Sequence, residues 1–193
     1  MFKLIKHRGF HDKYIKENTY EGIKLALESD EYIGVEFDVR ETLDNEIILF
    51  HNPIYNNKLV SKTKYNELPR YVPKLKNILN IKSDKIFLIE IKNIKHMNIF
   101  LNIVGNFKNK NIYIMSFYLK YIKDINVIDR FYKIGILNYV LNTNNYIKEL
   151  DFVCILNNLI NEVIINELKG IQVISYGITN IKKYNNVIYI VDN

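Results

Sequence analysis

The chain has 193 residues, of which 48% are hydrophobic and 25% are charged, a composition typical of a folded globular protein. This length favours one domain over residues 1–193. The formal net charge is +6, but the basic residues are spread along the chain, which argues against a nucleic-acid partner. No stretch approaches the ~20 apolar residues of a membrane span and no signal-peptide core is visible, so we expect no transmembrane segment and a cytoplasmic location.

The hydrophobic periodicity of the sequence predicts strands that alternate with helices. Asn18 is expected to cap the first helix, and an extended run at 46–50 follows an Asp44-Asn45 turn signal. Residues 52–74 contain all three prolines and are expected to be irregular. Strands are expected at 4–6, 33–40, 85–91, 111–116, 133–137, 152–156, 171–176 and 187–191. Helices are expected at 19–29, 75–79, 94–107, 118–131 and 159–169, with helical turns at 146–150 and 181–184.

Eight strands separated by helices predict a parallel sheet, and eight is the number of strands that closes an α/β barrel. Such barrels usually need about 250 residues, so a chain of 193 residues must shorten its helices and loops. The last predicted strand ends only two residues before the end of the sequence. We therefore expect a compact (β/α)8 TIM-type barrel with reduced helices and no C-terminal helix.

Carboxylates end two of the predicted strands. Because residues i and i+2 of a strand point to the same face, Glu36, Asp38 and Arg40 share one face. Glu90 ends the following barrel strand, and the carboxyl ends of barrel strands gather at one end of the barrel. Three carboxylates facing a barrel interior need a neutralising cation, and Mg²⁺ or Ca²⁺ suits oxygen ligands. The alternative is a structural ion pair between Glu36 and Arg40 or a nearby lysine.

Histidines and cations follow the same strand ends. His7 and His51 each end an apolar run, and two histidines can divide general-acid and general-base roles near neutral pH. The alternative is one catalytic and one structural histidine. Arg8 suits bidentate contacts to phosphate, and Lys92 suits the negative charge that develops on a phosphoryl oxygen. Lys92 can also pair with Glu90 in the free protein.

Three other side chains, those of His11, His96 and Cys154, are not expected to take part in this chemistry. His11 is expected in a loop near the entrance of the site. His96 falls within a predicted helix and is expected to face solvent. The single cysteine, Cys154, lies in an apolar run and is expected to be a buried, inert thiol.

Several short motifs occur in order along the chain. They are HRG at 7–9, EN-T at 17–19, EFDVRETLDNEI at 36–47, HNP at 51–53, VPKLKNIL at 72–79, EIK at 90–92 and Ser116-Phe117. In this order they resemble the glycerophosphodiester phosphodiesterase family. The resemblance implies a barrel enzyme that uses a divalent metal to hydrolyse small-molecule glycerophosphodiesters to glycerol 3-phosphate and an alcohol. It implies His7 and His51 as the acid/base pair, with a neighbouring substrate hydroxyl or a water attacking phosphorus. It also implies that Glu36, Asp38 and Glu90 bind the metal and that Arg8 and Lys92 hold the phosphate.

The sequence also departs from the family pattern. The family usually has His-Asp where this chain has His51 followed by Asn52, which weakens the support for that histidine. The insertion segment is shortened to about residues 52–84 with one short helix, so we expect a more open site with fewer contacts to the alcohol. An aromatic residue that the family carries near the seventh strand is replaced by Tyr176, which is expected to line the substrate pocket. Asp192 resembles the family's closing Thr-Asp.

Other functions remain compatible with the sequence. A phosphodiesterase for lysophospholipids or phosphoinositides would use the same chemistry on another alcohol. A non-catalytic ligand-binding barrel is favoured by the short chain and by Asn52. A nucleic-acid binder is a more distant alternative. A missing outer helix would expose apolar barrel wall, so a homodimer that covers this wall is also a hypothesis.

Overall fold

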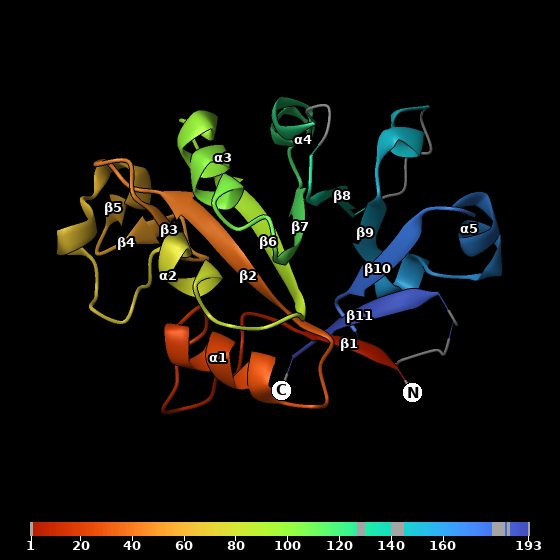
Figure 1. Cartoon of the computed structure of the whole chain (residues 1–193), viewed down its shortest axis with the longest axis horizontal. Helices are drawn as coiled ribbons and strands as arrows, with labels where there is room; N and C mark the ends of the chain where they lie inside the picture. Colours follow the sequence, from red (N-terminus) through yellow and green to blue (C-terminus); the bar gives the residue numbers. More distant parts are fainter. Residues whose placement is uncertain (1, 127–129, 140–144, 179–183, 185, 193) are drawn as a thin grey trace.

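The structure is a computed structural model that describes residues 2–126, 130–139, 145–178, 184 and 186–192. Eight parallel strands close into a barrel because the first strand pairs with both the second and the last. The predicted TIM-type barrel is therefore confirmed (Figure 1). In barrel order the strands are β1 (Lys3–Lys6), β2 (Gly34–Glu41), β6 (Ile86–Asn93), β7 (Asn111–Ser116), β8 (Lys133–Asn138), β9 (Phe152–Leu156), β10 (Gln172–Tyr176) and β11 (Val187–Val191).

A ninth strand, β3 (Ile47–Leu49), runs antiparallel to the end of β2 and extends the sheet at the rim of the barrel. It corresponds to the extended run expected at 46–50. The chain then forms a small hairpin from β4 (Ile54–Tyr55) and β5 (Lys58–Leu59). Residues 52–74 are therefore less irregular than expected, because the turn residues Asn56 and Asn57 adopt positive φ angles of 45° and 60°, which suit a tight hairpin. Two 3₁₀ turns, Val60–Lys62 and Tyr65–Glu67, follow the hairpin.

The helices lie around the outside of the strands (Figure 1). Thr19, not Asn18, caps the first of them, because the Thr19 hydroxyl accepts a hydrogen bond from the Gly22 amide at 3.2 Å. The structure places the short helix at 75–79 as expected, but three other helices are shorter than predicted. The helices are α1 (Tyr20–Glu28), α2 (Leu75–Leu79), α3 (Met97–Gly105), α4 (Leu119–Ile125) and α5 (Glu162–Glu167).

The segments before α3 and α5 show why two of these helices were predicted too long. Ile94 is buried in the connection that leaves β6, so α3 begins only after His96 takes the N-cap position. A 3₁₀ turn at Asn157–Leu159 precedes α5, whose N-cap is Asn161. The turn expected at 146–150 is a 3₁₀ helix at Asn145–Glu149. The turn expected at 181–184 falls on residues outside the described part of the chain.

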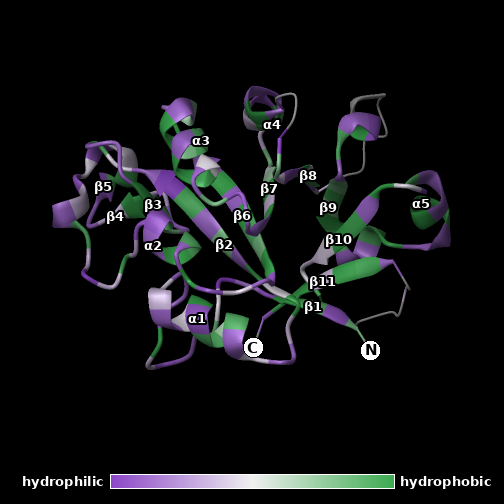
Figure 2. Ribbon diagram, viewed as in Figure 1, coloured by the Kyte–Doolittle hydropathy of each residue, from purple (hydrophilic) through white to green (hydrophobic). Residues whose placement is uncertain are grey.

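The barrel has an inner and an outer apolar core. The inner core fills the barrel with residues of every barrel strand except β2 and includes Leu88, Phe152 and Cys154. Cys154 is a fully buried free thiol, as expected, and burial raises its pKa. The outer core lies between the strands and the surrounding helices and includes the fully buried Phe37 and Phe87. In Figure 2, β2 differs from a plain apolar strand because hydrophilic residues interrupt it, and these residues build the site.

The outer face of β11 is covered without a following helix in the described residues. Val187 and Tyr189 face outward and are only 2% and 1% exposed. The Phe2 ring packs edge-on against the Tyr189 ring at 5.9 Å. The expected exposure of barrel wall is therefore wrong at β11, and the homodimer stays a prediction. None of the helices in the described ranges has the length and apolar character that crossing a membrane requires.

Candidate active site

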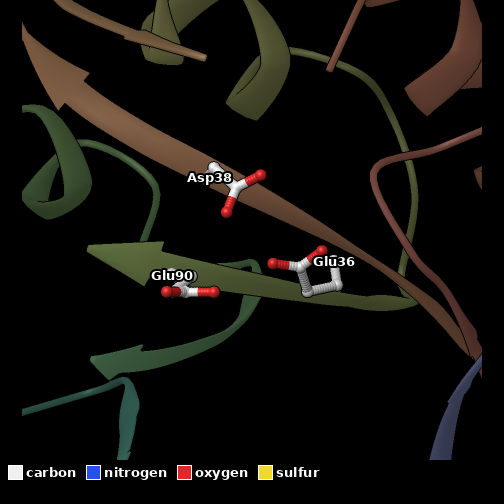
Figure 3. Close-up of side chains that lie close together, drawn as sticks. All are labelled: Glu36, Asp38 and Glu90. Carbon is white, nitrogen blue, oxygen red and sulfur yellow. The ribbon is translucent and has the colours of Figure 1, made fainter. Parts of the chain in front are cut away.

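Three buried carboxylates meet at the carboxyl ends of two adjacent strands. Glu36 and Asp38 belong to β2 and Glu90 belongs to β6, where Asp38 and Glu90 are register partners. Each offers a carboxylate oxygen that lies within 4.8 Å of the others. Figure 3 shows the three side chains close together beside the two strands. The alternation of β2 explains the cluster, because the intervening Val35 and Phe37 pack in the outer core.

The three carboxyl groups differ in their ease of ionisation. Burial, followed by the charges of Asp38 and Glu90, raises the pKa of Glu36 well above its ordinary value. Burial also raises the pKa of Glu90 to about 7. Burial acts in the same direction on Asp38, but the nearby cations Lys92 and Arg8 outweigh it and lower the pKa of Asp38. Asp38 is therefore the anion around which the two cations are arranged.

These two cations already partly neutralise the cluster. The Arg8 Nε atom lies 3.1 Å from Asp38 Oδ2, and the Lys92 Nζ atom lies 3.3 Å from Asp38 Oδ1. Lys92 Nζ also lies 2.6 Å from Glu90 Oε1. The ion pair between Lys92 and Glu90 that the sequence suggested is thus present. Arg8 adopts a positive φ of 54°, a conformation that costs a non-glycine residue of order 1 kcal/mol and that clusters at functional sites.

The two predicted catalytic histidines are both held through Nδ1, but by different groups. His7 Nδ1 lies 2.5 Å from Asp192 Oδ1, and its Nε2 lies 3.7 Å from Glu36 Oε2. His51 Nδ1 lies 3.2 Å from the neutral Oδ1 of Asn52. Burial lowers the pKa of both imidazoles from the ordinary value. Both histidines therefore tend toward the neutral form that can accept a proton.

Arg40 does not form the ion pair with Glu36 that the sequence left open. Its Nε and Nη2 atoms donate to the carbonyl oxygen of His51 at 3.0 and 2.7 Å. Arg40 therefore fixes the backbone that carries His51. The lysine and arginine ion pairs of the acidic cluster are instead made by Arg8 and Lys92, whose side chains pair with Asp38 and Glu90 but not with Glu36.

Sequence reasoning missed one supporting residue, Asn18. Its Nδ2 group donates to Asp38 Oδ2 at 2.9 Å, and its Oδ1 accepts from the Asp38 backbone N–H at 3.1 Å. Asn18 is buried and has a φ of 57°. The neighbouring Glu17 accepts a hydrogen bond from Arg8 Nη1 at 2.8 Å. The EN-T motif contained the signal, but a helix-cap role alone was assigned to its asparagine.

A cavity of about 230 Å³, here called the inner cavity, lies over the acidic cluster. All the predicted site residues except Asp38 line it, Tyr176 included. Its opposite wall is aromatic. The Phe117 and Tyr139 rings stack with centroids 4.6 Å apart, and each lies 6.3 Å from the Tyr176 ring. The Tyr176 hydroxyl donates to the Asn138 carbonyl at 3.2 Å, which orients the ring.

The two remaining histidines lie away from the inner cavity. His11 lines the adjoining cavity, and its Nδ1 lies 3.0 Å from the Gly9 carbonyl oxygen. His96 does not lie within a helix facing solvent as expected. It stands at the N-cap of α3, and its side chain contacts Glu41. The Glu41 carboxylate also accepts the backbone N–H groups of Lys95 and His96 at 2.6 and 2.8 Å, so this pair anchors the start of α3.

The acidic cluster is chemically suited to a divalent metal ion. Glu36 Oε1 is buried and has no hydrogen-bond partner among the described residues. A buried carboxylate oxygen without a partner is costly unless a cation faces it. Carboxylate oxygens are also the ligands that hard divalent cations prefer. The three residues therefore fit such an ion, and no other group of this kind is found among the described residues.

Solved structures with the same fold are identical to this chain at less than a quarter of the compared positions. A glycerophosphodiester phosphodiesterase from Thermotoga maritima is 22% identical with a TM-score of 0.78, over 98% of this chain and 94% of that chain. One from Parabacteroides distasonis is 18% identical with a TM-score of 0.77, over 99% and 92%. An Oleispira antarctica phosphodiesterase, solved with the product sn-glycerol-3-phosphate, is 16% identical with a TM-score of 0.80, over 92% and 85%.

Comparison with curated protein sequences finds no match. A family model does match residues 7–170, which is most of the chain and contains every predicted site residue except Tyr176. The model describes the glycerophosphoryl diester phosphodiesterase family. The fold agrees with this match, because the solved relatives form the same barrel. The chain therefore belongs to the glycerophosphoryl diester phosphodiesterase family and to its class of phosphodiester-hydrolysing enzymes.

Proposed function

We propose that this protein hydrolyses glycerophosphodiesters to glycerol 3-phosphate and an alcohol, in a reaction that needs a divalent metal and two histidines. One observation carries the proposal: the inner cavity is faced by the acidic cluster, two cations and two histidines of a chain in this family. The Oleispira antarctica relative was solved with sn-glycerol-3-phosphate, which is the product expected here.

Glu36, Asp38 and Glu90 would hold the metal, with Mg²⁺ or Ca²⁺ as the expected ion. When bound, a divalent ion supplies positive charge that polarises a phosphoryl oxygen. Arg8 and Lys92 face the same cavity and are suited to bind the other phosphate oxygens. In the free protein, Arg8 and Lys92 both pair with carboxylates of the acidic cluster. A bound metal ion would neutralise these carboxylates, so part of the positive charge of the two side chains could then act on the substrate.

His7 and His51 would move the protons. A water or a neighbouring hydroxyl of the substrate forms a new bond to phosphorus, and the bond between phosphorus and the alcohol oxygen breaks. One histidine accepts the proton of the attacking group, and the other donates a proton to the departing oxygen, so the protons balance. If the substrate's own hydroxyl attacks, a water then opens the cyclic phosphate with the two roles reversed. The asymmetric support by Asp192 and Asn52 suits this division of roles.

The test is release of glycerol 3-phosphate from a panel of glycerophosphodiesters, with Mg²⁺, Ca²⁺, Mn²⁺ or EDTA. We expect turnover with at least one metal and none in EDTA. His7→Asn and His51→Asn should each lower kcat by about 10²- to 10⁴-fold, the usual contribution of general acid–base catalysis. A folded wild-type protein without turnover under any condition would contradict the proposal and favour a ligand-binding barrel. Full activity in either histidine variant would contradict the assigned roles.

A further inference from the structure

The hairpin of β4 and β5 turns an apolar face to solvent. Ile54 and Leu59 are register partners in its two antiparallel strands, so their side chains share one face of the hairpin. Ile54 is 54% exposed and Leu59 is 43% exposed. A hairpin with one face on the protein normally carries polar residues on the face that meets water. This hairpin presents a pair of aliphatic side chains there instead.

The other face of the hairpin is anchored to the protein. Tyr55 packs against a small apolar cluster, and its ring lies edge-on to the Phe50 ring with centroids 6.3 Å apart. The Val60 N–H donates to the Pro53 carbonyl at 2.9 Å and closes the base of the hairpin. The anchored face therefore holds the two aliphatic side chains outward.

The segment that contains the hairpin is rich in lysine. Residues 53–67 include Lys58, Lys62 and Lys64 and a single acidic residue, Glu67. The Lys58 Nζ atom lies 3.8 Å from Glu67 Oε2. Lys62 and Lys64 are exposed and form no ion pair with another described residue. The exposed aliphatic pair thus lies on a segment with a net positive charge.

The loops at the active-site end of the barrel are basic as a whole. In a barrel these loops follow the carboxyl ends of the strands. They contain nine lysines and arginines against six aspartates and glutamates, so their net charge is positive. Over the described part of the chain these loops are 7–19, 42–46, 50–74, 94–96, 117–118, 139, 157–161, 177–178 and 192.

The negative charges of these loops are also the ones already engaged. Each of the six acidic side chains accepts a hydrogen bond or forms an ion pair. The acidic cluster itself is buried inside the barrel and paired with Arg8 and Lys92. Six of the nine loop cations, in contrast, form no ion pair among the described residues, and they are Lys13, Lys16, Lys62, Lys64, Arg70 and Lys95.

Exposed tyrosines lie in the same loops. Tyr14, Tyr71, Tyr118 and Tyr139 are all among the exposed large side chains of the described residues. Tyrosine combines an apolar ring with a polar hydroxyl and is enriched where water meets lipid. Aliphatic side chains, tyrosines and unpaired cations match the hydrocarbon boundary, the interface and the anionic head groups of a bilayer, in that order.

Two other occupants fit this surface less well. A second copy of the chain that docks through the same patch would bring the unpaired cations of both copies together, which is repulsive. A nucleic acid would use the cations and the tyrosine rings, but it would leave Ile54 and Leu59 without a partner.

We infer that the β4–β5 hairpin and the cations around it dock the protein on a bilayer surface that contains anionic phospholipids. Ile54 and Leu59 enter the boundary of the hydrocarbon, and the lysines bind the head groups. Ile54 follows His51 by three residues, so docking keeps the active-site end of the barrel next to the lipid. The inference is independent of the proposed function, because binding to a vesicle requires no turnover.

The first test is sedimentation of the protein with vesicles of phosphatidylglycerol and phosphatidylcholine in equal parts, and with vesicles of phosphatidylcholine alone. We expect at least about tenfold tighter binding to the anionic vesicles, weakened by added salt. The double variant Ile54→Ser/Leu59→Ser should bind them about tenfold more weakly or worse, because it removes the apolar contact. Lys62→Gln/Lys64→Gln should weaken binding by a similar factor, because it removes two charges.

Val163→Ser is the matched control. Val163 is 65% exposed on α5, which lies on the opposite side of the molecule from the hairpin (Figure 1). This variant loses an exposed aliphatic side chain without touching the proposed docking surface, so it should bind the vesicles like the wild type. Equal thermal midpoints of all variants in the absence of lipid would exclude a loss of binding through unfolding.

A second measurement reports insertion directly. The sequence contains no tryptophan, so Ile54→Trp provides a single fluorescent reporter on the hairpin. Its emission should shift to shorter wavelength with anionic vesicles and be quenched by lipids brominated in the acyl chains, and Val163→Trp should show neither effect. No vesicle binding, hairpin variants that bind like the wild type, or an unchanged Ile54→Trp spectrum would each overturn the inference. Tighter binding to single-stranded RNA than to anionic vesicles would overturn it in favour of a nucleic-acid surface.

Discussion

The two halves of the barrel contribute opposite kinds of side chain to the inner cavity. The half formed by β1, β2 and β6, with the end of β3, supplies both histidines, both cations and the acidic cluster. The half formed by β7, β8 and β10 supplies Met115, Phe117, Leu137, Tyr139 and Tyr176. Asp192, after β11, is the polar exception and reaches back to His7. The comparison shows that one half carries the charged and titratable groups of the cavity and that the other forms its apolar, aromatic wall.

This separation has an electrostatic reason. Charged groups at the end of a barrel need partners, and neighbouring strands bring such partners within hydrogen-bond distance. Asp38 on β2 thus contacts groups that follow β1 and that end β6. An aromatic wall on the opposite side limits access of water and strengthens the charges that face it. Substitutions in the two halves are therefore expected to differ in their effects on turnover and on substrate binding.

Replacing a carboxylate of the charged half should remove activity without removing stability. We expect Glu36→Gln to lower kcat/KM about 10³-fold, or about 4 kcal/mol at about 1.36 kcal/mol per factor of ten. A carboxyl group whose folded pKa is raised destabilises the fold above its unfolded pKa, and burial raises the pKa of Glu36. The thermal midpoint of Glu36→Gln in EDTA at pH 7 should therefore equal or exceed that of the wild type.

Glu41→Gln is the matched control on the same strand. His96 and two backbone N–H groups outweigh burial and lower the pKa of Glu41, so this carboxylate stabilises the fold at neutral pH. Glu41→Gln should keep the turnover of the wild type but be less stable than the wild type at pH 7. This difference in stability should shrink as the pH falls through the folded pKa of Glu41. Equal losses of activity in the two variants would contradict the separation of functional from structural carboxylates.

Loosening the support of the acidic cluster should have a smaller effect. Asn18→Gly removes both hydrogen bonds to Asp38 and tolerates the positive φ at this position. Removal of a group that orients a metal ligand typically costs 10- to 100-fold in metal affinity or activity. We expect that range for the apparent Mg²⁺ affinity from activity titrations. An unchanged titration with unchanged kcat would show that Asp38 needs no support from Asn18.

Changing the aromatic half should affect substrate binding more than turnover. Tyr176→Ala removes one ring of the aromatic wall and should raise KM about tenfold, with a smaller change in kcat. Tyr176→Phe keeps the ring and loses only the hydroxyl that donates to the Asn138 carbonyl, so we expect a less than threefold change. A fall in kcat at constant KM would instead indicate that Tyr176 acts in the chemical step and not in substrate binding. Steady-state kinetics on one substrate suffices.

The smallest effect on activity is expected for the residues that contact Nδ1 of the two histidines, Asp192 and Asn52. Asn52→Asp would give His51 a carboxylate partner like the one that His7 has in Asp192. Burial lowers the pKa of His51, and a nearby negative charge raises it again. We expect the limb of the pH–rate profile that reports the pKa of His51 to move to higher pH, with kcat changing only about a fewfold. A downward shift, or none, would contradict the assigned contact between residue 52 and His51.

Most of the barrel could be predicted from the sequence, because its strands are short apolar runs with clear ends. The strand that carries Glu36 and Asp38 has alternating apolar and acidic residues, which fixes the face that each side chain occupies. The positions of Glu90 and Lys92 followed from the same reasoning. Helix ends were predicted less well, because the apolar residues around Ile94 continue the helical pattern although they belong to the outer core.

The supporting contacts could not be predicted from local patterns. Asn18 reads as a helix cap, and only the folded chain brings it beside Asp38, 20 residues away. The contact between Glu41 and His96 spans 55 residues and depends on how β2 and the start of α3 pack. The groove lined by Tyr14, Tyr20, Tyr65 and Tyr71 could not be predicted either, because residues 14–20 and 65–71 come together only in the folded chain. Long-range placement, not residue type, limited the prediction.

The pairing of Lys92 and Arg8 with the acidic cluster has a consequence for how the protein is made. Many metalloproteins remain unfolded until the ion binds, because uncompensated ligands repel one another. Here internal ammonium and guanidinium groups partly compensate the ligands in advance. Under the proposed function, the chain can therefore complete its barrel without the ion and bind it afterwards. Chelators would then remove activity reversibly and leave the barrel folded.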